Sequence, residues 1–96
     1  DRDIFSIAHE EEIGVVVIVR VRGGRFFSRE KIYLRQIRTP EEALESVITR
    51  FYMDSFDIPK ELTLPFVVPN EDAIYLWLSE KRGGALKIKY PQRGVS

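Results

Sequence analysis

The spacing of apolar residues predicts strands at the start of the chain. Residues 4–8 are apolar and bounded by charges, and residues 13–22 are β-branched almost throughout, which is typical of strands. Gly23 and Gly24 allow a tight reversal with positive φ, and residues 25–36 then alternate between two different faces. The first third of the chain therefore predicts three antiparallel strands, the last two joined as a hairpin.

The apolar period then lengthens to about three and a half residues, which predicts a helix. Thr39 is a good N-cap, Pro40 suits the first helical position, and Glu42 completes a capping box. One stripe of this helix is apolar, so we expect the helix to lie on a sheet; the stripe consists of Leu44, Val47, Ile48, Phe51 and Tyr52.

Two more strands and a second helix complete the pattern. Residues 61–68 predict a fourth strand, in which Pro65 requires either a bulge or a shorter strand. Asn70 is expected to cap a helix that ends at Gly83, and residues 85–90 predict a fifth strand. The inward positions of the second helix are Ile74, Trp77 and Leu78, so Trp77 is interpreted as a core residue and not as a stacking platform.

The order β-β-β-α-β-α-β predicts the fold class. Three antiparallel strands come first, and two right-handed crossovers then add parallel strands beside the first strand. We expect an α/β protein with a ribonuclease H-like mixed five-stranded sheet, in the order 3-2-1-4-5, and two helices. A ferredoxin-like sandwich is the alternative, but it requires a helix directly after the first strand.

Length and composition indicate one globular domain over residues 1–96, with 44% hydrophobic residues. The chain opens without Met and stops soon after its last strand, so we interpret it as a domain cut from a longer polypeptide. Its longest apolar run, residues 15–19, is too short to cross a bilayer. It has no cysteine, which excludes disulfides and thiolate metal sites and suits the cytoplasm.

The net charge of zero hides four blocks of alternating sign. Residues 1–19 carry a net charge of −4, residues 20–38 of +6, residues 39–72 of −6, and residues 73–96 of +4. Such separation predicts a basic side that can meet phosphate or an acidic partner. The alternative is that the arginines of the second block serve solubility alone.

Several segments in order along the chain resemble the UvrC family. They are residues 1–4 (DRDI), 21–25 (VRGGR), 51–52 (FY), 58–62 (IPKEL) and 91–94 (PQRG). The resemblance implies the nuclease subunit of bacterial UvrABC nucleotide excision repair, an SOS response function, and the central segment that precedes the endonuclease domain. It also implies three partners: the remainder of the UvrC chain, UvrB, and damaged duplex DNA.

A ribonuclease H-like nuclease needs several carboxylates around two divalent ions, and one of these carboxylates projects from the middle of the first strand. The endonuclease domain of the family resembles this chain there but has an aspartate where Ser6 stands. Asp1, Asp3 and Glu61 lie at strand beginnings, the wrong end for such a site. We therefore expect no catalytic residue, no metal and no cofactor, and we interpret the remaining candidates as surface acids: Glu10, Glu11, Glu12 and Asp72.

The third strand carries the main candidates for DNA contact. Arg25, Arg29, Lys31 and Arg35 share a predicted face with Phe27 and Tyr33, where cations can follow a phosphate backbone while rings pack on sugar or base. The alternative is that charges on an edge strand prevent aggregation. Three further DNA candidates line the last strand and its exit, namely Lys87, Lys89 and Arg93, and the lone histidine, His9, is interpreted as structural or exposed.

Three hypotheses of function follow. The first is a non-catalytic, DNA-proximal module that sets the spacing between the nucleases of the parent protein. The second is a docking domain for UvrB or the adjacent endonuclease domain, without DNA contact. The third is an active metal-dependent nuclease. An exposed apolar sheet face would also favour a dimer of the fragment.

Overall fold

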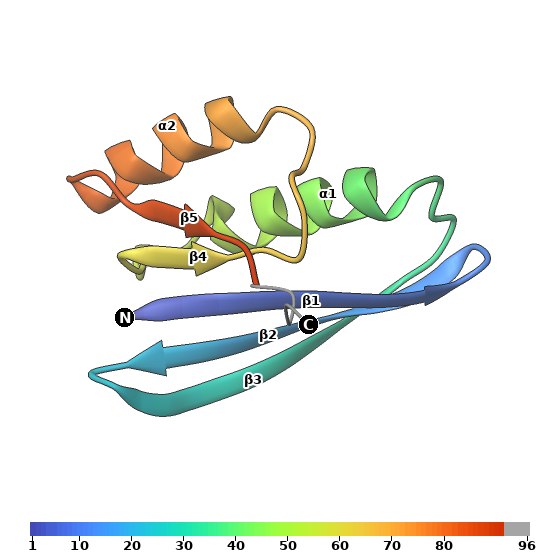
Figure 1. Cartoon of the computed structure of the whole chain (residues 1–96), viewed down its shortest axis with the longest axis horizontal. Coiled ribbons are helices and arrows are strands. Elements are labelled where there is room, and N and C mark those ends of the chain that lie inside the picture. Colours follow the sequence, from blue (N-terminus) through green and yellow to red (C-terminus); the bar gives the residue numbers. More distant parts are fainter. Residues whose placement is uncertain (92–96) are drawn as a thin grey trace, which may run out of the picture.

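The computed structural model describes residues 1–91, and the predicted order of elements is confirmed (Figure 1). Arg93 and the rest of the closing segment lie outside the described residues. None of the helices within residues 1–91 has the length and hydrophobicity that crossing a membrane requires. The elements are β1 (Arg2–Glu10), β2 (Ile13–Arg22), β3 (Arg25–Leu34), α1 (Pro40–Met53), β4 (Glu61–Thr63), α2 (Glu71–Arg82) and β5 (Lys87–Lys89).

The five strands form one mixed sheet in the order β3-β2-β1-β4-β5. The pairs β1–β2 and β2–β3 are antiparallel, whereas β1–β4 and β4–β5 are parallel. This arrangement confirms the predicted α/β, ribonuclease H-like topology. Both helices lie beside β1, β4 and β5, and β3 forms the opposite edge of the sheet (Figure 1).

The lengths of four strands differ from the prediction. β4 ends at Thr63, so Pro65 lies outside it and the shorter-strand interpretation is correct. β5 spans only Lys87–Lys89, while β1 is longer than expected, at 9 residues. β3 ends at Leu34 and leaves Arg35 beyond the strand.

The core lies between the sheet and the two helices. Alternate residues of β1 and β2, such as Phe5 and Ile18, are buried against Leu44 and Tyr52 of α1 and Leu78 of α2. Burying one such side chain contributes roughly 1.5–3 kcal/mol. Side chains of a strand point alternately to the two faces of a sheet. Both helices cover the same face, so every second side chain of β1 and β2 projects from the face that the helices leave open.

The predicted cap of the first helix is confirmed and that of the second is wrong. The Thr39 hydroxyl oxygen accepts a hydrogen bond from the N–H of Glu42 at 3.1 Å. Asn70 has a left-handed backbone (φ 56°) and makes no side-chain cap. Its amide donates to the Glu45 carboxylate at 2.9 Å, a partner in the other helix. Gly83 ends α2 in the left-handed conformation, as predicted.

Candidate nucleic-acid interface

One face of the sheet has no helix over it among the described residues. We call it the uncovered face and define it by four half-buried valines of β2 and the residues paired with them; the valines are Val15, Val17, Val19 and Val21. Directly paired residues project from the same face of a sheet. The sheet register therefore decides which side chains share this face.

Two rows of side chains run across all five strands on the uncovered face. The first row is Arg29, Val19, Ile4, Thr63 and Lys89, and the second is Phe26, Val21, Arg2, Glu61 and Lys87. A third, shorter row is Lys31, Val17 and Ser6. Each row is apolar at β2 and basic at one or both edges.

The fold thus brings together two groups of predicted DNA-contact residues. Arg29 and Lys31 lie on β3, and Lys87 and Lys89 lie on β5, all four exposed on the uncovered face. The two edge strands are four strand spacings apart, about 19 Å at about 4.8 Å each. The Lys89 ammonium lies 3.2 Å from the Glu61 carboxylate, so part of its charge is neutralised.

The predicted grouping of Arg25 and Phe27 with the other β3 residues is wrong. The register shifts between Arg20 and Val21, which leaves Phe27 as an extra residue in β3. Such a bulge breaks the alternation of faces. Arg25 is consequently paired with Arg22, on the helix side, and Phe26 takes the place expected for Phe27.

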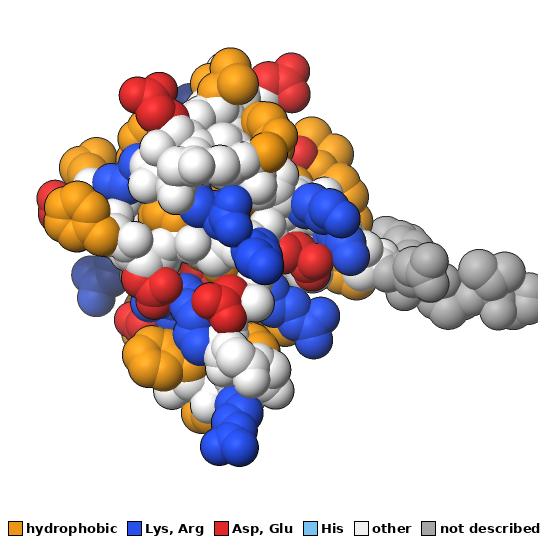
Figure 2. Space-filling view, turned by 90° about the vertical axis from the view of Figure 1, so that its left-hand side faces the viewer, with side chains coloured by type: hydrophobic (Ala, Val, Ile, Leu, Met, Phe, Trp, Pro, Cys, Tyr) orange, Lys and Arg blue, Asp and Glu red, His pale blue; other side chains and the backbone are white. Residues whose placement is uncertain are grey.

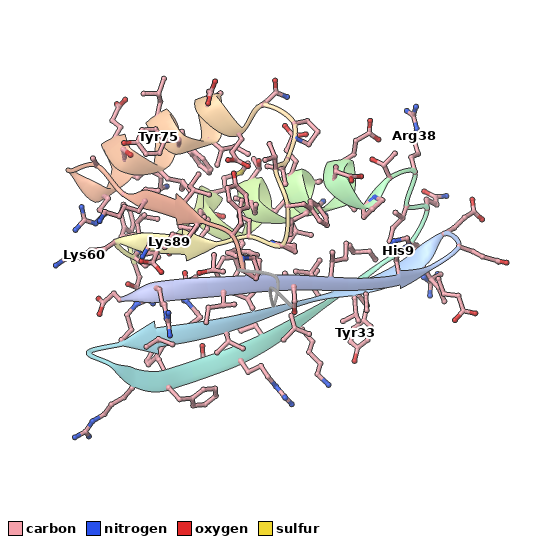
Figure 3. All side chains as sticks on the ribbon, in the orientation of Figure 1. His9, Tyr33, Arg38, Lys60, Tyr75 and Lys89 are labelled. Carbon is pink, nitrogen blue, oxygen red and sulfur yellow. The ribbon has the colours of Figure 1, made fainter. Side chains whose placement is uncertain are left out.

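A shallow hollow of about 580 Å³ lies at the end of the uncovered face near the β1–β2 turn. Ala8, Val15 and Tyr33 form a further cross-strand row that lines it, and Ile13 and Arg35 lie at its end. Arg35 therefore joins the uncovered face although it lies beyond β3. Figure 3 shows Tyr33 and His9 at this end of the sheet and Lys89 on β5.

An ionic cluster that the sequence reasoning missed lies on the helix side. Asp3, which is fully buried, accepts hydrogen bonds from Arg20 Nε at 3.3 Å, Arg22 Nη1 at 2.8 Å and the Tyr52 hydroxyl at 2.5 Å. Asp57 accepts from Arg20 Nη2 at 3.2 Å and from Arg22 Nε at 3.0 Å. The cluster joins the start of β1 and the end of β2 to the loop after α1.

The cluster shifts the pKa of two of its members, Tyr52 and Arg22. Burial, reinforced by the neighbouring Asp3 carboxylate, raises the pKa of the Tyr52 hydroxyl well above its usual value. Burial lowers the pKa of the Arg22 guanidinium, but hydrogen bonds and charges from Asp3 and Asp57 outweigh it, so the pKa is raised. Acidic and basic side chains also adjoin at the surface of this end of the molecule (Figure 2).

A sequence signal for this cluster does exist. Arg20 and Arg22 continue the alternation of the buried Val16 and Ile18, so they occupy positions that face the core. Asp3 precedes the buried Phe5 by two residues in the same way. Charged residues at core positions are almost always paired, and this rule would have linked them.

The carboxylates that the structure describes are not arranged as a metal site. Among residues 1–91, no group of three or more His, Cys, Asp or Glu side chains is arranged to hold an ion. Asp3 is buried and lies in the same strand as Ser6, where a metal-binding carboxylate would be expected. Two guanidinium groups and a hydroxyl donate hydrogen bonds to the Asp3 carboxylate. Ser6 is exposed on the uncovered face, opposite Val17.

The remaining residues singled out from the sequence lie apart from this face or at its end. His9 is exposed near the β1–β2 turn. Trp77 is half-buried against the core, and the Lys81 ammonium lies 5.4 Å from the centre of its ring. The same ammonium lies 5.8 Å from the ring of Phe56, which is 95% exposed.

Comparison with known proteins gives a consistent result. The family described as UvrC Ribonuclease H-like domain matches residues 1–96. The UvrABC system protein C of Alkaliphilus metalliredigens is 34% identical over 96 residues, and that of Caldanaerobacter subterraneus subsp. tengcongensis is 32% identical over 96 residues. These alignments cover 98% of the chain but only 15% and 16% of the relatives. The chain thus spans about one sixth of their length.

Proposed function

The chain belongs to the UvrC family through its ribonuclease H-like domain, and we propose that it is a non-catalytic, DNA-proximal module of an excision nuclease subunit. In this role the domain is a structural part of a larger protein that acts with UvrB in nucleotide excision repair of damaged DNA. Its uncovered face contacts the nucleic-acid backbone.

The charge of the three rows is the observation that carries this proposal. Together they hold five basic side chains and one acidic side chain; the bases are Arg2, Arg29, Lys31, Lys87 and Lys89. The acid, Glu61, is paired with one of the lysines. A basic face of this kind attracts phosphate without reading sequence, and such binding weakens as salt rises.

The proposal is tested by charge reversal with a matched control. In the double variant R29E/K31E, the affinity for duplex DNA should fall. The slope of log K against log salt should become shallower by the equivalent of about two phosphate contacts. R25E makes the same type of change on β3 but on the other face, so its loss should be smaller. Fluorescence anisotropy with labelled duplex measures both. Equal losses of affinity in R25E and in the single variants R29E and K31E would show that the contact is not specific to the uncovered face.

The non-catalytic part rests on the engagement of Asp3 and on the hydroxyl at position 6. A hydroxyl supplies no anionic charge to a hard cation, and Asp3 is held by Arg20 and Arg22. We expect no incision of DNA by the chain with Mg²⁺ or Mn²⁺. Incision that disappears in E10Q or E11Q would show an active nuclease instead.

A docking role is the second candidate, favoured by exposed apolar side chains. Phe56 is 95% exposed and Met53 is 55% exposed, beside Lys81 at the carboxyl end of α2. Here UvrB or the adjacent endonuclease domain would cover the patch without DNA contact. Loss of UvrB binding in F56A, with unchanged binding in R29E/K31E, would favour this role.

A dimer of the chain also stays a prediction. Two β3 edges can pair antiparallel about Glu30, but this register places Arg29 opposite the Lys31 of a second copy. Like charges directly opposite each other destabilise a strand pair. Sedimentation at high concentration tests the prediction, and a strict monomer would count against the dimer.

A further inference from the structure

We propose that Tyr33 and the hollow beside it receive an unpaired base, so that the uncovered face prefers single-stranded nucleic acid to duplex. This inference rests on the proposed nucleic-acid contact and adds the class of strand that is bound. It comes from the placement of two rings among the basic residues.

Two aromatic side chains flank two basic side chains along the uncovered face of β3. Phe26 is 68% exposed and Tyr33 is 76% exposed, and both project from the uncovered face. Arg29 and Lys31 lie between them on the same face. A large exposed ring is costly to leave in water, and two at the ends of a basic strand provide stacking surfaces that flank phosphate contacts.

The hollow gives the base a place beside the ring. Tyr33 and apolar residues that include Ala8, Val15 and Ile13 line it. Its polar lining residues are Arg35, His9 and one acid, Glu10. Figure 3 shows Tyr33 projecting from the sheet at this end. A mainly apolar lining with a ring and a guanidinium among its members suits a base and its phosphate.

The pairing state of the strand follows from the geometry of stacking. In a duplex the faces of the bases are covered by their neighbours, so a side-chain ring cannot stack on them unless a base is displaced. Phosphates, by contrast, are accessible in both forms. The basic rows therefore serve either form, whereas Tyr33 contributes only when a base is unpaired.

A protein segment is the competing occupant of the hollow. The charge of the face argues against an ordinary peptide, because Arg29, Lys31 and Arg35 flank Tyr33 along the same strand and its continuation. A polyanion is the complementary partner. Binding of an acidic peptide in place of oligonucleotide would be the outcome that favours protein.

The experiment compares labelled oligothymidylate with a labelled duplex by fluorescence anisotropy at one salt concentration. The wild-type chain should bind the single strand more tightly. Y33A should lose about tenfold in affinity for the single strand, the factor that ~1.4 kcal/mol of stacking represents. Its duplex affinity should stay within about twofold, and Y33F, which keeps the ring, should bind like wild type.

Controls separate this inference from the proposed function. F56A removes an exposed ring on another part of the surface and should leave both affinities unchanged, and circular dichroism confirms folding of each variant. If R29E/K31E weakens both complexes but Y33A weakens neither, the nucleic-acid contact stands and the base site is refuted. If the wild-type chain binds neither probe, the proposed contact fails, and this inference with it.

Discussion

Replacing the buried Asp3 with asparagine should destabilise the chain more than any other single change of charge. The substitution keeps the size of the side chain but removes the negative charge that faces Arg20 and Arg22. Both guanidinium groups then remain largely buried with one counter-charge fewer. Removal of one partner of a buried ion pair costs about 3–5 kcal/mol.

The lower end of that range applies here because Asp57 remains. It lies 3.2 Å from Arg20 and 3.0 Å from Arg22, so the cations keep one carboxylate. The side chain of Asp57 is 51% exposed, and its own removal in D57N should cost about 1 kcal/mol or less. We therefore expect about 3 kcal/mol for D3N, a large part of the roughly 5–15 kcal/mol that holds a domain folded.

Urea unfolding followed by the fluorescence of Trp77 measures the difference. With a slope of about 1.5 kcal/mol per molar urea for a small domain, D3N should lower the midpoint by about 2 M. D57N should lower it by well under half that amount. A D3N midpoint no lower than that of D57N would refute the reasoning that burial makes Asp3 the main counter-charge.

Three further changes test local features of the fold. In G14A the new Cβ would lie 2.7 Å from a side-chain carbon and 2.9 Å from a carbonyl oxygen, so thermal unfolding should show that the free energy of unfolding falls by about 1–3 kcal/mol. In the control variant G84A the new Cβ meets only a flexible side chain, so the free energy of unfolding should be nearly unchanged. T39A should cost about 1 kcal/mol by urea unfolding because it removes a cap, while N70G removes no cap and should not destabilise α2 comparably. The raised pKa of Tyr52 means that the folded state keeps a proton which the unfolded state releases above about pH 10; urea midpoints should therefore fall as pH rises above 10, and should fall less in Y52F.

The elements could be predicted where a periodic pattern extends over many residues. α1 spans 14 residues and β2 spans 10 residues, and the sequence pattern locates both correctly. β4 and β5 are only 3 residues long, which is too short for the two-residue alternation of a strand to be recognised in the sequence. Asn70 was misread because its amide bonds to Glu45, 25 residues away, and no local rule anticipates such a partner.

The candidate interface could be predicted in part. The alternation of β3 correctly grouped Arg29, Lys31 and Tyr33, because no irregularity interrupts that part of the strand. It misplaced Arg25 because one extra residue in a strand reverses every face beyond it. The link between β3 and β5 could not be read from the sequence, since it depends on the register of all five strands.

The same register separates the charges that stabilise the fold from those available for binding. In residues 20–38, Arg20 and Arg22 face the helices and are paired with Asp3 and Asp57. Arg29 and Lys31 face the other way and have no acid opposite them on β2. Substitutions on the uncovered face therefore leave the ionic cluster intact. A loss of binding in R29E/K31E with an unchanged urea midpoint would consequently report on the surface and not on the fold.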